Sequence, residues 1–255
     1  MSPQLAGRTA VVTGGARGLG LSMARALARE GVRIALFDLL DQVVDSAAEL
    51  TAELGVDSAG FRVDVRSEAS VSEGFRQVTD GLGTPDILVN AAGLTIWSDS
   101  LDTDQETWQR VLDVNLTGTF LTCREFGRGC RDQGQPGAIV NVSSMSGRVV
   151  NVPQHQASYN TSKAGVDMLT KSLAVEWADL GIRVNAIAPG YVLSDMTRQF
   201  TDAQPEIAER WRSMIPLGRM AEPADLDALV VFLCSPGASY LTGQSIVIDG
   251  AYTAI

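Results

Sequence analysis

Tyr159 and Lys163 form the pair whose residue types and spacing most directly suggest chemistry. They lie four positions apart in the segment YNTSK, so on a helix they share a face, one turn apart. A free phenol has a pKa of about 10, which is too high for a good base at neutral pH. A neighbouring ammonium group lowers that pKa, and the pair could then move a proton. The alternative is a polar loop that runs into a helix, with Tyr159 half-buried and Lys163 solvated.

Hydroxyl and amide groups gather just ahead of Tyr159, in the segment SMSGRVVNVPQHQ at 144–156. Ser144 could hold a substrate oxygen through a hydrogen bond that strengthens as charge develops there, or it could be a turn residue. A site that pairs many substrate hydroxyls discriminates strongly, because an analogue without them leaves buried polar groups unpaired. His155 is the single histidine, and its alternative is a rim or structural role. The predicted substrate contacts are Ser144, Ser146, Gln154, His155, Gln156, Tyr159 and Tyr191.

A glycine-rich turn, TGGARGLG at 13–20, follows the first apolar run and opens a helix. Gly14, Gly18 and Gly20 have the spacing G-x-x-x-G-x-G. Without Cβ atoms the chain can turn tightly, and backbone N–H groups can approach a pyrophosphate at the positive end of the helix. A plain turn is the alternative, but the strand–turn–helix context favours a dinucleotide site.

Asp38 ends the second apolar run, in ALFDLL. A carboxylate there can accept hydrogen bonds from the hydroxyls of an adenosine ribose and would repel a 2′-phosphate. Arg17 in the glycine turn could instead bind that phosphate, but no basic residue follows Asp38 in the next ten positions. The sequence therefore predicts NAD in preference to NADP, with an N-cap as the alternative role of Asp38.

Short β-branched runs alternate with longer amphipathic stretches along the whole chain. This alternation predicts an α/β chain with a parallel sheet: a single-domain, doubly wound Rossmann fold over residues 1–255, with helices on both faces of seven strands. The irregular segment near 190–220 is expected to be a substrate loop or lid. The predicted strands are 9–13, 33–37, 59–63, 86–90, 138–142, 183–187 and 245–248, and the predicted helices are 18–30, 41–54, 67–80, 104–131, 158–180 and 222–235.

Composition excludes several classes of function. A net charge of −10 and an isoelectric point near 4.6 argue against binding to nucleic acid or to an anionic membrane. The N-terminal residues show no signal peptide and no apolar run reaches the ~20 residues of a membrane helix, so we expect a cytoplasmic protein. Three unpaired cysteines suit a reducing compartment and are expected to be small buried hydrophobes. One histidine and no Cys/His cluster make a catalytic zinc site improbable.

Several motifs in register make the chain resemble the short-chain dehydrogenase/reductase family almost from end to end. TGGARGLG is similar to the family's cofactor loop, and DV at 64–65 to its adenine contact. NAAG at 90–93 is similar to the family's NNAG, with Ala91 in place of the second Asn. The motifs VLDVNLTGTF, NVSSMSG and YNTSK, and then PG at 189–190, follow in the family's order.

The resemblance implies a catalytic tetrad of Asn115, Ser144, Tyr159 and Lys163. Tyr159 would be the general base in oxidation and the general acid in reduction. Lys163 would also hold the nicotinamide ribose, and Asn115 would fix a water that completes a proton relay. Ser144 precedes Tyr159 by fifteen residues, two more than is usual in the family, and Ser143 remains a less suitable alternative. The implied cofactor contacts are Gly14, Arg17, Gly18, Leu19, Gly20, Asp38, Asp64, Val65, Asn90, Ala91, Gly93, Tyr159, Lys163, Pro189, Gly190, Val192 and Ser194.

Within the family, the pattern NVPQ-x-Q-x-SYN-x-SK resembles the polyol and ketose members, such as mannitol, arabinitol and xylulose oxidoreductases. The expected activity is therefore an NAD-dependent interconversion of a secondary alcohol and a ketone, on a small-molecule polyol or ketose. The rivals are a 3-oxoacyl carrier-protein or keto-ester reductase, for which Arg128, Arg131 and Arg148 could attract an acidic carrier, and a catalytically silent nucleotide-binding member.

Assembly and the apolar side of the site are further expectations. The resemblance implies a homotetramer or homodimer, in which helices beginning near 104 and 158 pair between subunits and the segment GQSIVIDGAYTAI completes a tetramer. An apolar wall beside the substrate, or alternatively core packing or a subunit contact, is expected from Trp97, Tyr191, Met196 and Phe200.

Overall fold

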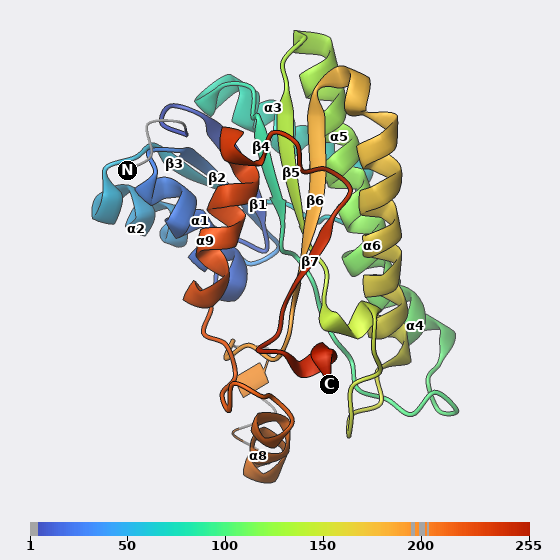
Figure 1. Cartoon of the computed structure of the whole chain (residues 1–255). Coiled ribbons are helices and arrows are strands. Elements are labelled where there is room, and N and C mark those ends of the chain that lie inside the picture. The colour runs from blue at the N-terminus through green and yellow to red at the C-terminus, as the bar shows by residue number, and fades with distance from the viewer. Residues whose placement is uncertain (1–4, 195–196, 199–201, 203) are drawn as a thin grey trace.

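The computed structural model describes residues 5–194, 197–198, 202 and 204–255. Seven parallel strands form one sheet in the order β3-β2-β1-β4-β5-β6-β7 (Figure 1). Met196 and Phe200, two of the residues expected in the apolar wall, lie outside the described residues. The strands are β1 Thr9–Thr13, β2 Arg33–Asp38, β3 Ser58–Arg62, β4 Ile87–Asn90, β5 Gly137–Val142, β6 Ile182–Pro189 and β7 Ser245–Ile248.

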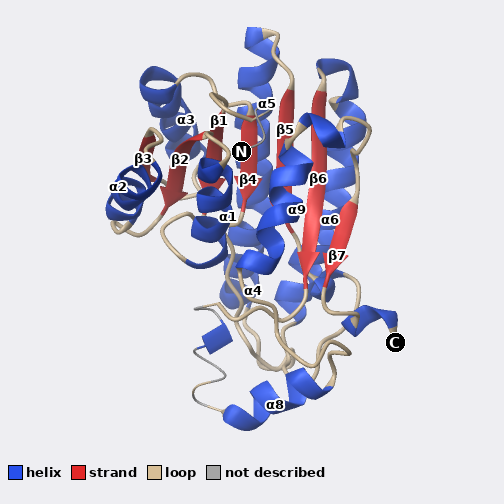
Figure 2. Cartoon of the chain, turned by 60° about the vertical axis from the view of Figure 1, so that its left-hand side comes forward, coloured by secondary structure: helices blue, strands red, loops and turns tan. Residues whose placement is uncertain are grey.

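Helices cover both faces of this sheet, and the views in Figures 1 and 2 show the resulting three layers. One apolar cluster joins α1, α2 and α9 to one face, and a second joins α3, α5 and α6 to the other. The helices are α1 Gly18–Arg29, α2 Val43–Leu54, α3 Glu68–Leu82, α4 Gln105–Leu112, α5 Gly118–Gln133, α6 Ala157–Glu176, α8 Pro205–Ser213 and α9 Ala224–Cys234, with short 3-10 turns at η2 Met145–Gly147, η3 Ala178–Leu180, η4 Pro236–Ala238 and η5 Tyr252–Ala254.

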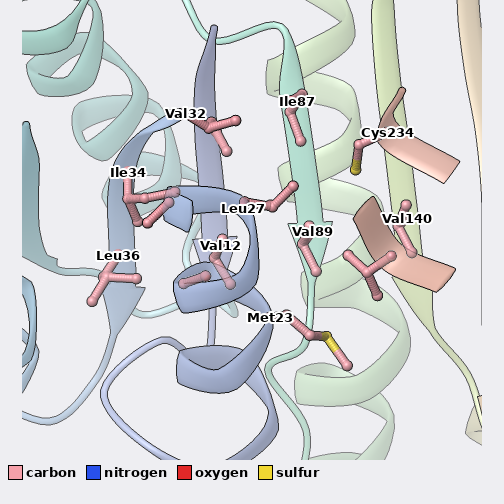
Figure 3. Packing of buried hydrophobic residues seen from close by; sticks show 14 of the residues in the cluster. Val12, Met23, Leu27, Val32, Ile34, Leu36, Ile87, Val89, Val140 and Cys234 are labelled. Atoms are coloured by element: carbon pink, nitrogen blue, oxygen red, sulfur yellow. The ribbon is translucent and has the colours of Figure 1, made fainter. Parts of the chain in front are cut away.

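The central strands carry unbroken apolar runs because both of their faces are buried. In β1, Val12 packs under α1 and α9 while its neighbour Val11 packs on the opposite face. In Figure 3, Met23 and Leu27 of α1 lie against Val12 and the neighbouring strands. The predicted doubly wound fold with seven parallel strands is therefore confirmed.

The long helix predicted over 104–131 is wrong in one respect. A π-helical turn, η1 at Asp113–Thr117, separates α4 from α5. Wider turns of this kind insert an extra residue into a helix and often occur at functional sites. This turn contains Asn115, so Asn115 does not lie on a regular α-helix as predicted.

The chain order reverses on the two sides of β1, since β1 pairs with β2 on one side and with β4 on the other. In open parallel sheets, ligands bind at such a switch point, outside the carboxyl ends of the strands. Among the described residues, no helix is both long enough and apolar enough to cross a membrane. The three cysteines are buried and unpaired, and burial raises the pKa of each thiol to about 12, as expected of small core residues.

Candidate active site

A cleft of about 630 Å³ opens at the carboxyl ends of β1, β2, β4, β5 and β6. It brings together residues that are more than 170 positions apart in the chain. Sixteen of the predicted cofactor contacts line it, and the remaining one, Asn90, is buried in the sheet. The sixteen are Gly14, Arg17, Gly18, Leu19, Gly20, Asp38, Asp64, Val65, Ala91, Gly93, Tyr159, Lys163, Pro189, Gly190, Val192 and Ser194.

The glycine turn forms one end of the cleft. Gly14 and Gly18 adopt left-handed backbone angles, with φ of 65° and 59°. A Cβ atom on Gly20 would lie 2.2 Å from the carbonyl oxygen of Gly14, so that position has no room for a side chain. Gly18, which begins α1, has open space where a Cβ atom would stand. The N-terminal N–H groups of α1 therefore lie beside open space in the cleft, where a phosphate group would fit.

Asp38 lies at the end of β2, where its carboxylate is held by backbone donors. It accepts hydrogen bonds from the N–H groups of Ala16 and Leu40, each at 3.0 Å. Asp38 thus ties the glycine turn to β2 and also faces the cleft. Farther along the cleft, Arg66 pairs with Asp64 at 2.6 Å and holds the pKa of that carboxyl below its usual range.

Lys163 is the buried charge at the other end of the cleft, with only 5% of its surface exposed. Its Nζ donates to the carbonyl oxygen of Val142 at 2.7 Å and lies 5.6 Å from the centre of the Tyr159 ring. Burial lowers the pKa of Lys163 to about 8, and the nearby charge of Asp167 opposes this shift.

The phenol of Tyr159 does not have the lowered pKa that the sequence predicted. Burial raises the pKa of Tyr159, and the hydrogen bond to Ser144 only opposes this effect. The prediction failed because it counted the ammonium of Lys163 and ignored the cost of taking both groups out of water. Within the chain by itself, burial outweighs the hydrogen bond from Ser144, and the pKa of Tyr159 rises.

The structure distinguishes the two neighbouring serines. Ser143 donates its hydroxyl to the backbone carbonyl of Lys163 at 3.1 Å, so it attaches β5 to α6. Both serines line the cleft, but Ser144 hydrogen-bonds with Tyr159 and accepts from the N–H of Ser146 at 3.1 Å. Of the two, Ser144 is therefore the one placed to meet a substrate oxygen.

Asn115 is buried beneath the cleft and does not line it. Its amide accepts from the N–H of Leu94 and donates to the carbonyl of Leu94, both at 2.9 Å. It also donates to Ser162 at 3.0 Å, and Ser162 donates to the carbonyl of Tyr159 at 2.7 Å. Asn115 therefore connects Leu94, directly after the NAAG segment, to the helix that carries Tyr159.

The polar rim predicted from the segment 144–156 is largely turned inward. Gln154, Gln156 and Ser146 are buried and hydrogen-bond to other side chains of the protein. His155 is 71% exposed on its side chain and lies 3.2 Å from Asp99. None of these four lines the cleft, so the structure does not place them at its rim, and their contact with a substrate stays a prediction. Their hydrogen-bonding capacity is used to hold the loop itself.

Tyr191, also a predicted substrate contact, is buried and stacks on Trp211 with 4.4 Å between the ring centres. Trp97 contacts the same indole edge-on at 5.9 Å. Sequence reasoning missed Trp211, because a tryptophan on a short helix carries no motif. It also missed Thr95, which lines the cleft and whose buried hydroxyl has no hydrogen-bond partner among the described residues.

Comparison with known proteins agrees with this geometry. A family model described as enoyl-(acyl carrier protein) reductase matches residues 14–253. A galactitol 2-dehydrogenase (L-tagatose-forming) of Cereibacter sphaeroides is 43% identical over 98% of this chain and 96% of its own length. The chain belongs to the short-chain dehydrogenase/reductase family. It is accordingly an oxidoreductase that uses a nicotinamide cofactor.

Two further relatives have different names but similar coverage. An NADP-dependent mannitol dehydrogenase of Hypocrea jecorina is 39% identical over 98% of this chain and 93% of its own length. A crystal structure of a short-chain type dehydrogenase/reductase from Mycobacterium marinum superposes with a TM-score of 0.94 at 39% identity, covering 99% of this chain and 98% of that one. The chain therefore matches each of these two relatives over nearly its whole length.

Proposed function

We propose that this enzyme interconverts a secondary alcohol and a ketone on a polyol or ketose, with NAD as the preferred hydride acceptor. The observation that carries the proposal is the placement of Ser144, Tyr159 and Lys163 together at one end of a cleft whose other end is the glycine turn. A dinucleotide that spans the cleft would bring its reactive ring to the phenol.

The residues of the cleft fit such a cofactor. The hollow beside Gly18 and the N-terminus of α1 would take the pyrophosphate, Asp38 the adenosine ribose, and Lys163 the nicotinamide ribose. A bound nicotinamide supplies the position that accepts or donates a hydride, and its oxidised form adds positive charge near the phenol.

Tyr159 transfers the proton that must accompany the hydride. Because burial raises its pKa, the phenol of the chain alone is protonated at neutral pH and is ready to act as an acid in ketone reduction. In alcohol oxidation it must act as a base, and positive charge from Lys163 favours that form. Ser144, hydrogen-bonded to the same phenol, holds the substrate oxygen on which charge develops.

A polyol substrate is supported by the relatives and by the hydroxyl groups around the reactive end. The galactitol and mannitol dehydrogenases share the full length of the chain. Ser144, Ser194 and Thr197 line the cleft, where their hydroxyl groups would bind the hydroxyls of a polyol. A sterol or long acyl chain would gain less from these groups.

A panel of polyols and ketoses, assayed with NAD and with NADP by absorbance of the reduced nicotinamide, tests substrate and cofactor together. We expect turnover of at least one sugar alcohol. Absence of turnover with every polyol and ketose, combined with rapid reduction of an acetoacetyl thioester, would overturn the proposal. The three arginines weighed for an acidic carrier already have partners: Arg128 binds Glu125, Arg131 binds Asp132, and Arg148 lies 3.7 Å from Asp167.

The preference for NAD rests on Asp38 at the adenosine end of the cleft. Arg17 and Arg66 also line that end, and one relative is named NADP-dependent. Whether Asp38 or these arginines set the preference between NAD and NADP can be tested by substitution. Asp38→Ala removes the carboxylate and should reduce the ratio of kcat/KM for NAD to that for NADP by tenfold or more, which is about 1.4 kcal/mol. An unchanged ratio would assign the preference to another residue.

We further propose that the enzyme is a homodimer or homotetramer. Phe120 of α5 is 38% exposed, and Met168 and Val175 of α6 are 61% and 80% exposed. Large apolar side chains on two neighbouring helices suit burial between subunits. Light scattering on the purified protein would measure the mass, and a monomer at micromolar concentration would refute this assembly.

A further inference from the structure

An aromatic cluster lies directly behind the reactive end of the cleft. Gly93–Thr95 line the cleft, and Trp97 lies two positions after Thr95. Ser144 lines the cleft and is followed by Met145, and Tyr191 stands between Gly190 and Val192, which both line it. The side chains of Trp97, Met145 and Tyr191 pack in one cluster with Trp211. The cluster therefore packs behind three segments of the cleft wall.

Trp211 comes from α8, a nine-residue helix that lies beyond the carboxyl ends of the strands, apart from the helices that cover the sheet (Figures 1 and 2). A helix of this length is not stable by itself in water, so its position depends on tertiary contacts. The indole of Trp211 is 1% exposed and stacks on Tyr191. Trp211 is thus the largest buried side chain of this helix, and Ile207 and the buried Ala208 add to its packing.

Gln154 links this helix to the loop that connects Ser144 to Tyr159. The Nε1–H of Trp211 donates to Oε1 of Gln154 at 3.2 Å. The Nε2 of Gln154 donates to the hydroxyl of Tyr191 at 3.2 Å. Both ends of one amide, itself 8% exposed, are therefore used to join the two stacked rings. A buried amide without hydrogen-bond partners costs free energy. The amide of Gln154 therefore favours the one arrangement in which it bonds both rings.

We propose that Gln154 is a positioning residue that determines substrate affinity by fixing Trp211 and Tyr191 behind the reactive end of the cleft. This proposal rests on the proposed function, because it concerns the alcohol or ketone end of that site. The glycine turn and Asp38, which would hold the pyrophosphate and the adenosine ribose, are not part of the cluster, so the effect of the link on cofactor binding should be small. Gln154 acts through the two rings and does not touch the substrate.

The test compares Gln154→Leu, Trp211→Phe and the double variant with the wild-type enzyme. Gln154→Leu removes both hydrogen bonds at similar volume, and Trp211→Phe keeps an aromatic ring for stacking but removes the indole N–H. We expect KM for the polyol to rise about tenfold in Gln154→Leu and by a smaller factor in Trp211→Phe. The double variant should resemble Gln154→Leu, because both changes break the same link. Values of kcat and of KM for the cofactor should stay within about twofold.

Gln135→Leu is the matched control, because Gln135 also donates a part-buried side-chain hydrogen bond, to the carbonyl of Pro85, but at the far end of the sheet. Hydrogen exchange of the backbone amides at 205–213 is a readout independent of turnover: exchange should accelerate in Gln154→Leu and stay unchanged in Gln135→Leu.

Two results would overturn the proposal. One is an unchanged exchange rate in α8 of Gln154→Leu. The other is a raised KM in Gln154→Leu with an unchanged KM in Trp211→Phe, which would mean that Gln154 contacts the substrate directly. If the wild-type enzyme turned over no polyol or ketose, the proposed function would fail, while the exchange experiment would still decide whether Gln154 holds α8.

Discussion

Lys163 has a measurable effect on stability, and its sign can be worked out from the structure. Burial lowers the pKa of this lysine from its ordinary value of 10.5 to about 8. Each pKa unit corresponds to about 1.4 kcal/mol, so the charged form is about 3 kcal/mol less favourable in the folded protein than in the unfolded chain. The penalty is fully present below pH 8 and disappears above pH 10.5, because the unfolded chain binds the proton more tightly between these values.

Lys163→Met removes this ionisation while keeping a side chain of similar length. The variant also leaves the carbonyl of Val142 without the lysine, which costs about 1–3 kcal/mol at every pH. That cost cancels when the variant is compared with itself at two pH values. Between pH 7.5 and pH 9.5 the wild-type protein should therefore gain about 2 kcal/mol of unfolding free energy relative to Lys163→Met.

Urea unfolding at matched protein concentration, followed by circular dichroism at several pH values in this window, measures the difference. Lys171→Met is the control, since it removes an exposed lysine from the same helix. Parallel stability curves for the wild type and Lys163→Met would show that Lys163 pays no desolvation penalty.

Three other substitutions test the site. Tyr159→Phe should reduce turnover by at least about 10³-fold while cofactor affinity, measured by fluorescence titration, stays within a few fold; retained activity would refute the acid–base assignment. Ser144→Ala should lower kcat about 10²-fold and move the acidic limb of the oxidation profile to higher pH, because the hydrogen bond that lowers the pKa of Tyr159 is lost, and a limb that did not move would count against that bond. Gly20→Ala places a Cβ atom 2.2 Å from the carbonyl oxygen of Gly14 and should abolish cofactor binding and lower Tm by several degrees. Gly81→Ala is its control, because Gly81 also lies in a helix without a left-handed φ but has open space where a Cβ atom would stand. This variant should keep both its cofactor affinity and its stability, and equal cofactor affinity in Gly20→Ala and Gly81→Ala would contradict the steric argument.

The features that could be predicted from the sequence are those carried by contiguous residues. The period of the apolar runs predicted seven parallel strands, and the glycine turn and Asp38 were assigned to one binding end because each follows a strand directly. Tyr159 and Lys163 could be paired from their spacing alone, since one helix holds both. Local geometry suffices for such inferences.

Contacts between distant segments decided the rest. Nothing in the order of residues shows that Ser143 turns to α6 while Ser144 turns to the cleft, or that a π turn places Asn115 against Leu94. The polar loop was predicted to face the substrate, but Gln154 turns to an indole 57 positions away. Desolvation likewise depends on everything packed around a group, so the raised pKa of Tyr159 follows from burial that spacing cannot reveal.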